Sequence, residues 1–179
     1  MSDTSILSRQ VGVAEPPSAP IEIVANAAER KALAAAYDLV GVKSLSATVT
    51  VSPVPGGGVS VEGHVVADIV QTCVVSLVPV DAHIDETFAV RYVRDPGKLP
   101  KVGAEVVVDP AAPDPPELLT GPTIDVGEIA EEYFVLAIDP YPHAPGATLP
   151  ADVLEDVGSS EDSPFAALAK LAKGAGDKG

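Results

Sequence analysis

Two alternating runs on either side of a glycine-rich turn constrain the fold more than any other feature of this chain. Residues 44–51 (SLSATVTV) and 59–72 (VSVEGHVVADIVQT) alternate apolar and polar side chains at the two-residue period of a β-strand. Between them, residues 53–58 (PVPGGG) combine prolines and glycines, which give the backbone the freedom that a hairpin turn needs. The sequence therefore predicts that the two runs pair as an antiparallel hairpin.

Further strand patterns lie before and after this hairpin. Residues 21–24 (IEIV) predict a short first strand, residues 84–93 (IDETFAVRYV) predict a third strand of the sheet, and residues 105–108 predict an edge strand. The apolar run at residues 73–80 (CVVSLVPV) fits either a short helix or a turn into the next strand, and its periodicity does not decide between them.

Two helices are predicted by their start signals. Asn26 followed by Glu29 resembles a capping box, and strong helix formers follow it, so we expect a helix over residues 26–40. Asp125 can cap a second helix over residues 125–138, where apolar side chains recur at helical spacing until two prolines end the pattern.

These patterns predict an α+β fold in which two or three helices pack on an antiparallel sheet, open or barrel-like, built from residues 44–108. The third helix would occupy residues 163–173, starting at a Ser-Pro pair and placing Phe165 and Leu168 on one apolar face. A helix this short is marginal alone, so we expect it to form only when docked on its own domain or on a partner.

Local composition predicts how the chain divides into a domain and its flanking segments. We expect a flexible leader at residues 1–19, one α+β domain over residues 20–146 and an acidic linker at residues 147–162. The docking helix follows at residues 163–173, and residues 174–179 are expected to be a disordered tail.

Negative charge is concentrated in the second half of the chain. The formal net charge is −15, and residues 102–169 contain fourteen Asp and Glu but no Lys or Arg. Such a surface repels phosphates, so a basic protein is a better candidate partner than nucleic acid. A solubilising surface with no partner is an equally open interpretation. The candidate partner residues are Glu128, Glu131 and Glu132, which lie mostly off the apolar face of the predicted helix.

One cationic cluster is the only candidate for contact with RNA phosphates. Arg91, Arg94, Lys98 and Lys101 fall within eleven residues and are interleaved with Tyr92. The alternative, that these are ordinary charges on a solvated strand end and loop, is the interpretation we favour.

The sequence offers no constellation that commits to a reaction. Cys73 is the only cysteine, which excludes an intrachain disulfide and fits a reducing compartment. A nucleophilic role would need His64 or His83 nearby, and a lone cysteine in an apolar run is more often a small core residue. The three histidines are too scattered for a zinc site, and His143 lies in a proline-rich loop. We therefore expect no catalytic residue, no metal and no cofactor.

The expected compartment is the cytoplasm. The first residues lack the pattern of a signal peptide, and no apolar run reaches the ~18–20 residues that a bilayer-spanning helix needs. We expect neither a membrane nor DNA as a partner, and the sequence gives no oligomeric state.

Three segments carry a family resemblance. Residues 63–93 (GHVVADIVQTCVVSLVPVDAHIDETFAVRYV) run from an alternating strand into a cysteine and a Leu-x-Pro step. Residues 124–146 (IDVGEIAEEYFVLAIDPYPHAPG) join an acidic helix to a proline–histidine–proline exit, and residues 163–171 (SPFAALAKL) form a Pro-Phe-x-x-Leu pattern. In this order they resemble the YceD family, the large ribosomal RNA subunit accumulation proteins of bacteria, also carried as a domain of unknown function.

One departure from the family pattern matters. Many relatives have Cys-x-x-Cys in the first segment, whereas this chain has Cys73 and Ser76, which removes any thiol-pair or metal inference. Its Cys-Val-Val-Ser-Leu form resembles the alphaproteobacterial branch.

The resemblance implies a non-enzymatic ribosome-biogenesis factor that supports the accumulation, processing or stability of large-subunit (23S) rRNA. We expect as partner either the large-subunit rRNA precursor, from the resemblance, or a basic ribosomal protein of that subunit, from the acidic half of the chain. The resemblance carries over no catalytic residues. The alternatives are a holder that binds the basic protein through the acidic half and, less favoured, an RNA-processing enzyme.

Overall fold

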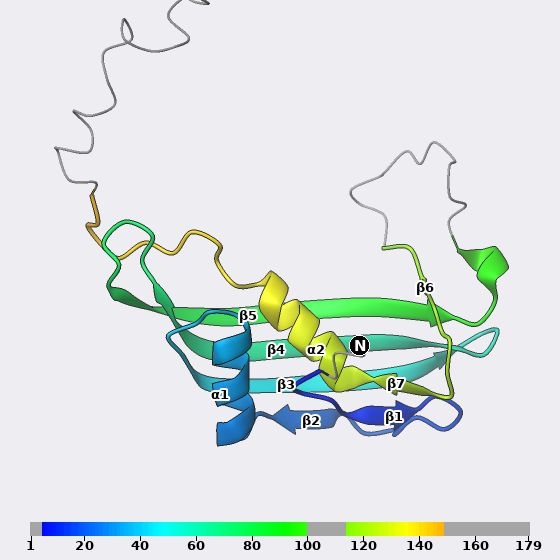
Figure 1. The fold of residues 1–179 in the computed structure, drawn as a ribbon. Helices are drawn as coiled ribbons and strands as arrows, with labels where there is room; N and C mark the ends of the chain where they lie inside the picture. Colours follow the sequence, from blue (N-terminus) through cyan, green and yellow to red (C-terminus); the bar gives the residue numbers. More distant parts are fainter. Residues whose placement is uncertain (1–4, 100–113, 149–179) are drawn as a thin grey trace, which may run out of the picture.

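The computed structural model describes residues 5–99 and 114–148 (Figure 1). The strands are β1 (Gln10–Gly12), β2 (Ile21–Val24), β3 (Gly41–Val54), β4 (Gly58–Thr72), β5 (Pro79–Val93), β6 (Glu117–Leu118) and β7 (Thr123–Asp125). The helices are α1 (Ala27–Ala36), the short 3-10 helix η1 (Pro96–Lys98) and α2 (Val126–Leu136). The main sheet has five strands in the order β2-β3-β4-β5-β6, and β1 pairs with β7 in a separate two-stranded sheet.

The predicted hairpin is confirmed and is longer than its alternating runs indicated. β3 and β4 pair antiparallel along most of their length, with one register shift between Val42 and Ser44. At the turn, Gly56 and Gly57 have φ angles of 94° and 78°, a left-handed conformation that glycine adopts at little cost. β5 continues the sheet antiparallel to β4 and begins at Pro79, before the predicted start at residue 84.

The inward-facing row of β4 forms the floor of the core. Val59, Val61, Val65, Ala67 and Ile69 are each at most 1% exposed. Gly63 interrupts this row, and the ring of Phe88 from β5 fills the space, so that a Cβ at Gly63 would overlap the ring. Phe88 stacks in turn on Tyr133 of α2, with ring centroids 4.6 Å apart. The missing side chain at Gly63 therefore helps to place α2 on the sheet.

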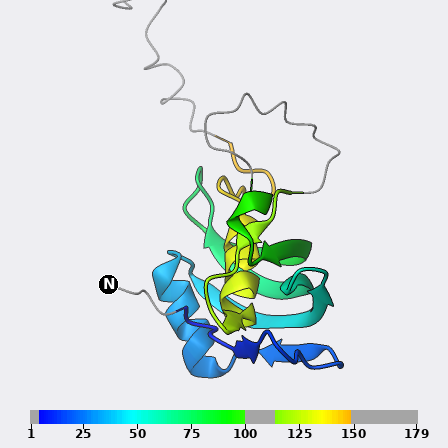
Figure 2. The ribbon, with the colours of Figure 1, turned by 90° about the vertical axis from the view of Figure 1, so that its right-hand side faces the viewer.

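Both helices lie on the same face of the sheet (Figures 1 and 2). α1 contacts β3, and α2 contacts β4 and β5. Asn26 caps α1 in the predicted capping box with Glu29. Asp125 caps α2 by accepting bonds from the N–H groups of Gly127 and Glu128. No helix in the described part of the chain is long and apolar enough to cross a bilayer.

The α+β class and the mostly antiparallel sheet are confirmed, and the sheet is open rather than closed into a barrel. Its two edges are the four-residue β2 and the two-residue β6, and β6 runs parallel to β5. These short edges leave no pair of long strands that could meet and close the sheet.

Other boundaries differ from the sequence prediction for local reasons. α1 ends at Ala36 rather than at residue 40, because Asp38 takes a left-handed backbone with φ of 53°. Residues 73–78 of the ambiguous run form a turn, and its last two residues, Pro79 and Val80, already belong to β5. The predicted strand at residues 105–108 and the predicted helix at residues 163–173 lie outside the described residues.

The N-terminal leader, predicted to be flexible, is part of the core from residue 5 onward. Leu7 is fully buried, and Val11 and Val13 are 8% and 5% exposed. β1 pairs antiparallel with β7, and the backbone carbonyl of Arg9 accepts a bond from the N–H of Val126 at 3.0 Å. The prediction failed because the partners of this segment lie at the other end of the chain, where no local pattern reveals them.

Candidate protein-binding grooves

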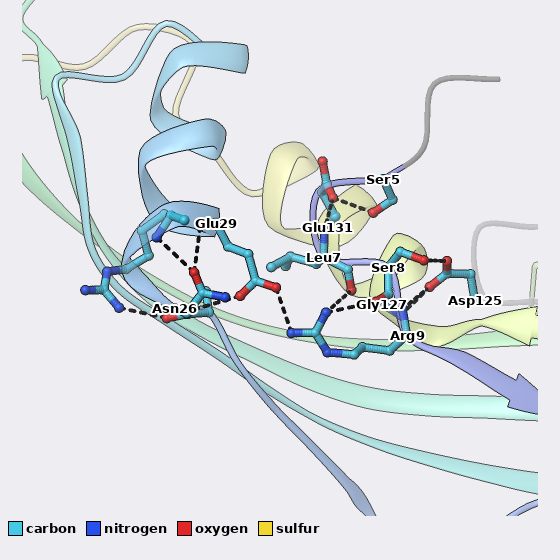
Figure 3. Close-up of polar contacts among 12 residues, drawn as sticks. Ser5, Leu7, Ser8, Arg9, Asn26, Glu29, Asp125, Gly127 and Glu131 are labelled. Atoms are coloured by element: carbon cyan, nitrogen blue, oxygen red, sulfur yellow. Dashed lines mark hydrogen bonds and ion pairs between the residues drawn. The ribbon is translucent and has the colours of Figure 1, made fainter. Parts of the chain in front are cut away.

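Glu131 joins three elements on the helix face. Glu131 is only 6% exposed. Its carboxylate accepts hydrogen bonds from the Ser5 hydroxyl and from the Leu7 N–H at 3.0 Å (Figure 3). The Tyr37 hydroxyl, at the end of α1, donates a third bond at 2.6 Å. Burial, followed by this bond, raises the pKa of Tyr37, so the hydroxyl stays protonated and keeps donating. Glu131, predicted as a partner-binding residue, is therefore a buried structural residue.

Asp125 makes the second polar joint between the N-terminal segment and α2 (Figure 3). One oxygen accepts the two capping bonds and a bond from the Arg9 N–H at 2.7 Å, and the other accepts from the Ser8 hydroxyl. Burial acts to raise the pKa of Asp125, but the bond from Ser8 and the three N–H bonds outweigh it and lower the pKa. The ionised carboxylate is thus the form that stabilises the fold.

We expect Asp125→Asn to lower the free energy of unfolding near neutral pH by about 1–2 kcal/mol, because asparagine still caps the helix but loses the charge and the acceptor for Ser8. The folded-state pKa lies below the unfolded value, so the stability from ionised Asp125 is present above about pH 4 and is lost as the pH falls through the folded-state pKa. Urea unfolding measured across this range should show a shallower acid loss in the variant. Parallel curves would contradict this role for the charge.

A groove of about 550 Å³ lies between α1, α2 and the N-terminal segment, and we call it the acidic groove. It is lined by Ser5, Ile6, Ala36, Tyr37, Glu128, Glu131 and Glu132. Glu128 and Glu132 are exposed one helical turn apart on α2, and within the described part of the chain no Lys or Arg lines this groove. The groove therefore combines apolar contact area with negative potential, which suits a cationic partner.

A second groove of about 420 Å³ shares Tyr37 with the first, and we call it the exit groove. It lies between the loop after α1, the end of β4 and residues 137–148, which we call the exit loop. Its lining includes Asp38, Asp139 and Gln71, and again no Lys or Arg among the residues that the structure describes. Sequence reasoning missed this groove, because the three segments that form it are far apart in the chain.

Cys73 holds the exit loop against the β4–β5 turn. Its side chain is fully buried, and the sulfur accepts bonds from the N–H groups of Ser76 at 3.3 Å and Ala144 at 3.2 Å. The bonds from Ser76, and then from Ala144, lower the pKa of Cys73 to about 6. A backbone bond from Val74 to the Pro142 carbonyl, at 2.9 Å, completes the joint. The first two segments of the family resemblance thus meet at this end of the sheet (Figure 1).

The three histidines make hydrogen bonds to groups other than Cys73. His64 pairs with Asp85 and His83 pairs with Asp68, each at 2.8 Å between exposed side chains of β4 and β5. His143 bonds to a backbone carbonyl of its own loop and does not line the acidic groove with Glu128 and Glu132. Within residues 5–99 and 114–148, no group of three or more His, Cys, Asp or Glu side chains could hold a metal ion.

Only part of the predicted RNA-binding cluster can be placed. Arg91 lies exposed on β5, and Arg94 follows the strand with its Nε donating to the Gly57 carbonyl at 2.9 Å. Arg94 is thus exposed but also holds the β3–β4 turn. Lys98 ends η1, and Lys101 lies outside the described residues.

The structure defines an α+β domain whose helix-covered face carries two adjoining grooves, the acidic groove and the exit groove, both of which contain carboxylate residues. The chain belongs to the YceD family: the family model described as large ribosomal RNA subunit accumulation protein YceD matches residues 61–172. A search of curated proteins found no match, and neither did a search of solved structures. The resemblance seen in the sequence is confirmed, and at the level of the family the role is in ribosome biogenesis.

Proposed function

We propose that this chain is a non-enzymatic ribosome-biogenesis factor that supports the accumulation, processing or stability of large-subunit (23S) rRNA by holding a basic protein of that subunit. The observation that carries the proposal is the acidic groove, where Glu128 and Glu132 face solvent beside apolar contact area and no Lys or Arg of residues 5–99 and 114–148 lines the walls. A lysine- or arginine-rich protein segment is attracted to such a surface, whereas an RNA backbone is repelled.

The non-enzymatic part of the proposal rests on the bonding of the reactive side chains. Cys73 is buried with its sulfur already accepting two N–H bonds, and His64 and His83 are paired with exposed aspartates of the sheet. These side chains therefore have structural partners that account for them. We place the activity in the cytoplasm, in keeping with a single free cysteine.

The test is a pull-down of the tagged full-length protein from its own cells, divided into RNase-treated and untreated halves. We expect a basic large-subunit protein to stay bound after RNase, and its recovery to fall about tenfold in the Glu128→Lys/Glu132→Lys variant, because two attractive charges become repulsive. Recovery should also fall as salt rises, since the groove charges are partly exposed.

A matched control places the same charge change on the other face of the sheet. Glu22→Lys/Glu62→Lys alters the net charge equally but leaves both grooves intact, and it should retain the partner. Loss of all bound material with RNase would overturn the proposal and make Arg91 and Arg94 the residues to mutate. Equal loss in both double variants would show that only net charge matters.

A further inference from the structure

Exposed apolar side chains gather at the end of the sheet where the β4–β5 turn meets the exit loop. Val74, Leu77 and Val78 of the turn are 48%, 75% and 46% exposed, and Tyr141 of the exit loop is 70% exposed. Val40, which lines the exit groove together with Val74, is 56% exposed. Large apolar groups that cluster on a surface in this way mark a site that something covers.

The backbone of the turn supports this interpretation. Leu77 has a φ of 59°, a left-handed conformation that is uncommon and unfavourable for a bulky side chain. The turn therefore presents Leu77 to solvent in a strained conformation. Strain of this kind persists at ligand-binding sites more often than elsewhere.

The polar groups of the exit groove specify the charge of its occupant. Among the described residues, Asp38 and Asp139 are the charged ones that line it. The Gln71 side chain, 5% exposed, donates to the Asp139 carbonyl at 2.7 Å, but its own oxygen has no hydrogen-bond partner among the described residues. A cationic donor in the occupant would match Asp38, Asp139 and the Gln71 oxygen. Apolar side chains in the occupant would match Val40 and Val74.

Residues 163–173, beyond the described part of the chain, carry this chemistry. In residues 163–173, Phe165 and Leu168 belong to one apolar face at helical spacing, and Lys170 and Lys173 supply positive charge in an otherwise acidic half of the chain. The described chain ends at Thr148, in the exit loop that lines the groove. The fourteen residues from 149 to 162 can span up to about 45 Å, ample to return to the groove.

We propose that residues 163–173 dock in the exit groove of the same molecule as a short amphipathic helix. Its apolar face covers Val40, Val74 and Tyr141, and its lysines lie near Asp38 and Asp139. The family match runs over residues 61–172, so it covers all but the last residue of this segment together with the β4 and exit-loop walls of the groove. Tethering by a short linker gives an effective concentration in the millimolar range, which allows a weak contact to be well populated.

The test is an amide NMR spectrum of the full-length ¹⁵N-labelled chain compared with its Leu168→Glu variant. We expect the signals of Val40, Val74 and Tyr141 to shift in the variant, and the signals of residues 163–173 to move to random-coil positions. Losing one buried leucine should lower the docked-to-free ratio about tenfold or more. The matched control is Ala167→Glu, which adds the same charge off the apolar face and should leave the spectrum of the groove unchanged.

A reciprocal variant, Val74→Asp, should release the same segment without altering it. Identical spectra for Leu168→Glu and the wild type would overturn the proposal. Shifts that depend on protein concentration would also overturn it, because they would make a second copy of the chain the occupant. Since the exit groove and the exposed glutamates of the acidic groove are distinct, this proposal and the proposed function can fail independently of each other.

Discussion

Replacing Glu131 with alanine is expected to lower the free energy of unfolding by about 3 kcal/mol, because three hydrogen-bond donors lose their acceptor at once. The Leu7 N–H is the most costly of these, since Leu7 is fully buried and its backbone cannot turn to water. The Tyr37 hydroxyl loses its partner as well, and with it the hydrogen bond that joins the end of α1 to α2. Urea unfolding followed by circular dichroism measures the change.

Two controls separate the carboxylate from the helix that carries it. Glu131→Gln should cost only about 1 kcal/mol, because its amide oxygen can still accept from Leu7 and the Tyr37 hydroxyl can reverse its role. Glu132→Ala, one residue along on the exposed side of α2, should change stability by about 0.5 kcal/mol or less. A loss for Glu131→Ala as small as that for Glu132→Ala would show that the buried joint contributes little.

The hairpin could be predicted because its information is local. The alternation in residues 44–51 and 59–72 reflects one buried and one solvated face, and Gly56 and Gly57 supply the turn within the same stretch. The caps of both helices were also predictable, since Asn26 and Asp125 bond to N–H groups only two or three residues away. Such contacts need no knowledge of the rest of the fold.

Glu131 could not be assigned in the same way, because its acceptor role depends on residues at the other end of the chain. Ser5 and Glu131 are 126 positions apart, and Leu7 and Glu131 are 124 apart. From sequence alone, three glutamates in five residues favour a solvated face, which is correct for Glu128 and Glu132. A weak signal was present: Val11 and Val13 alternate with Gln10 and Gly12, and Leu7 lies in phase with them although Arg9 interrupts the apolar row.

The grooves were unpredictable for a related reason. The acidic character of the second half was evident, but Tyr37, shared by both grooves, comes from α1, and Ser5 comes from the leader. Cys73 was expected to be a small core residue, and it is buried, but its bond from Ala144 is a contact across 71 positions. The sequence therefore predicts the acidic character of the groove surfaces. It does not predict which segments face each other across the grooves.

Gly127→Ala is expected to destabilise the fold by about 2–3 kcal/mol, although alanine is the better helix former. Alanine in place of glycine within a helix gains about 1 kcal/mol of intrinsic propensity. In this structure, however, a Cβ at Gly127 would overlap the backbone carbonyl of Leu7 and would lie 2.9 Å from the Arg9 nitrogen. Backbone atoms cannot rotate away as the end of a side chain can, so the N-terminal segment must move and Leu7 must leave its site.

The control is Gly12→Ala in β1, where a Cβ would have no atom within 4 Å and stability should hardly change. Because Gly127→Ala and Glu131→Ala would both release the N-terminal segment, their effects on the free energy of unfolding should not add in the double variant. Additive losses would show that the two residues act on separate parts of the fold. A stabilised Gly127→Ala variant would mean that the N-terminal segment does not pack on α2 in solution.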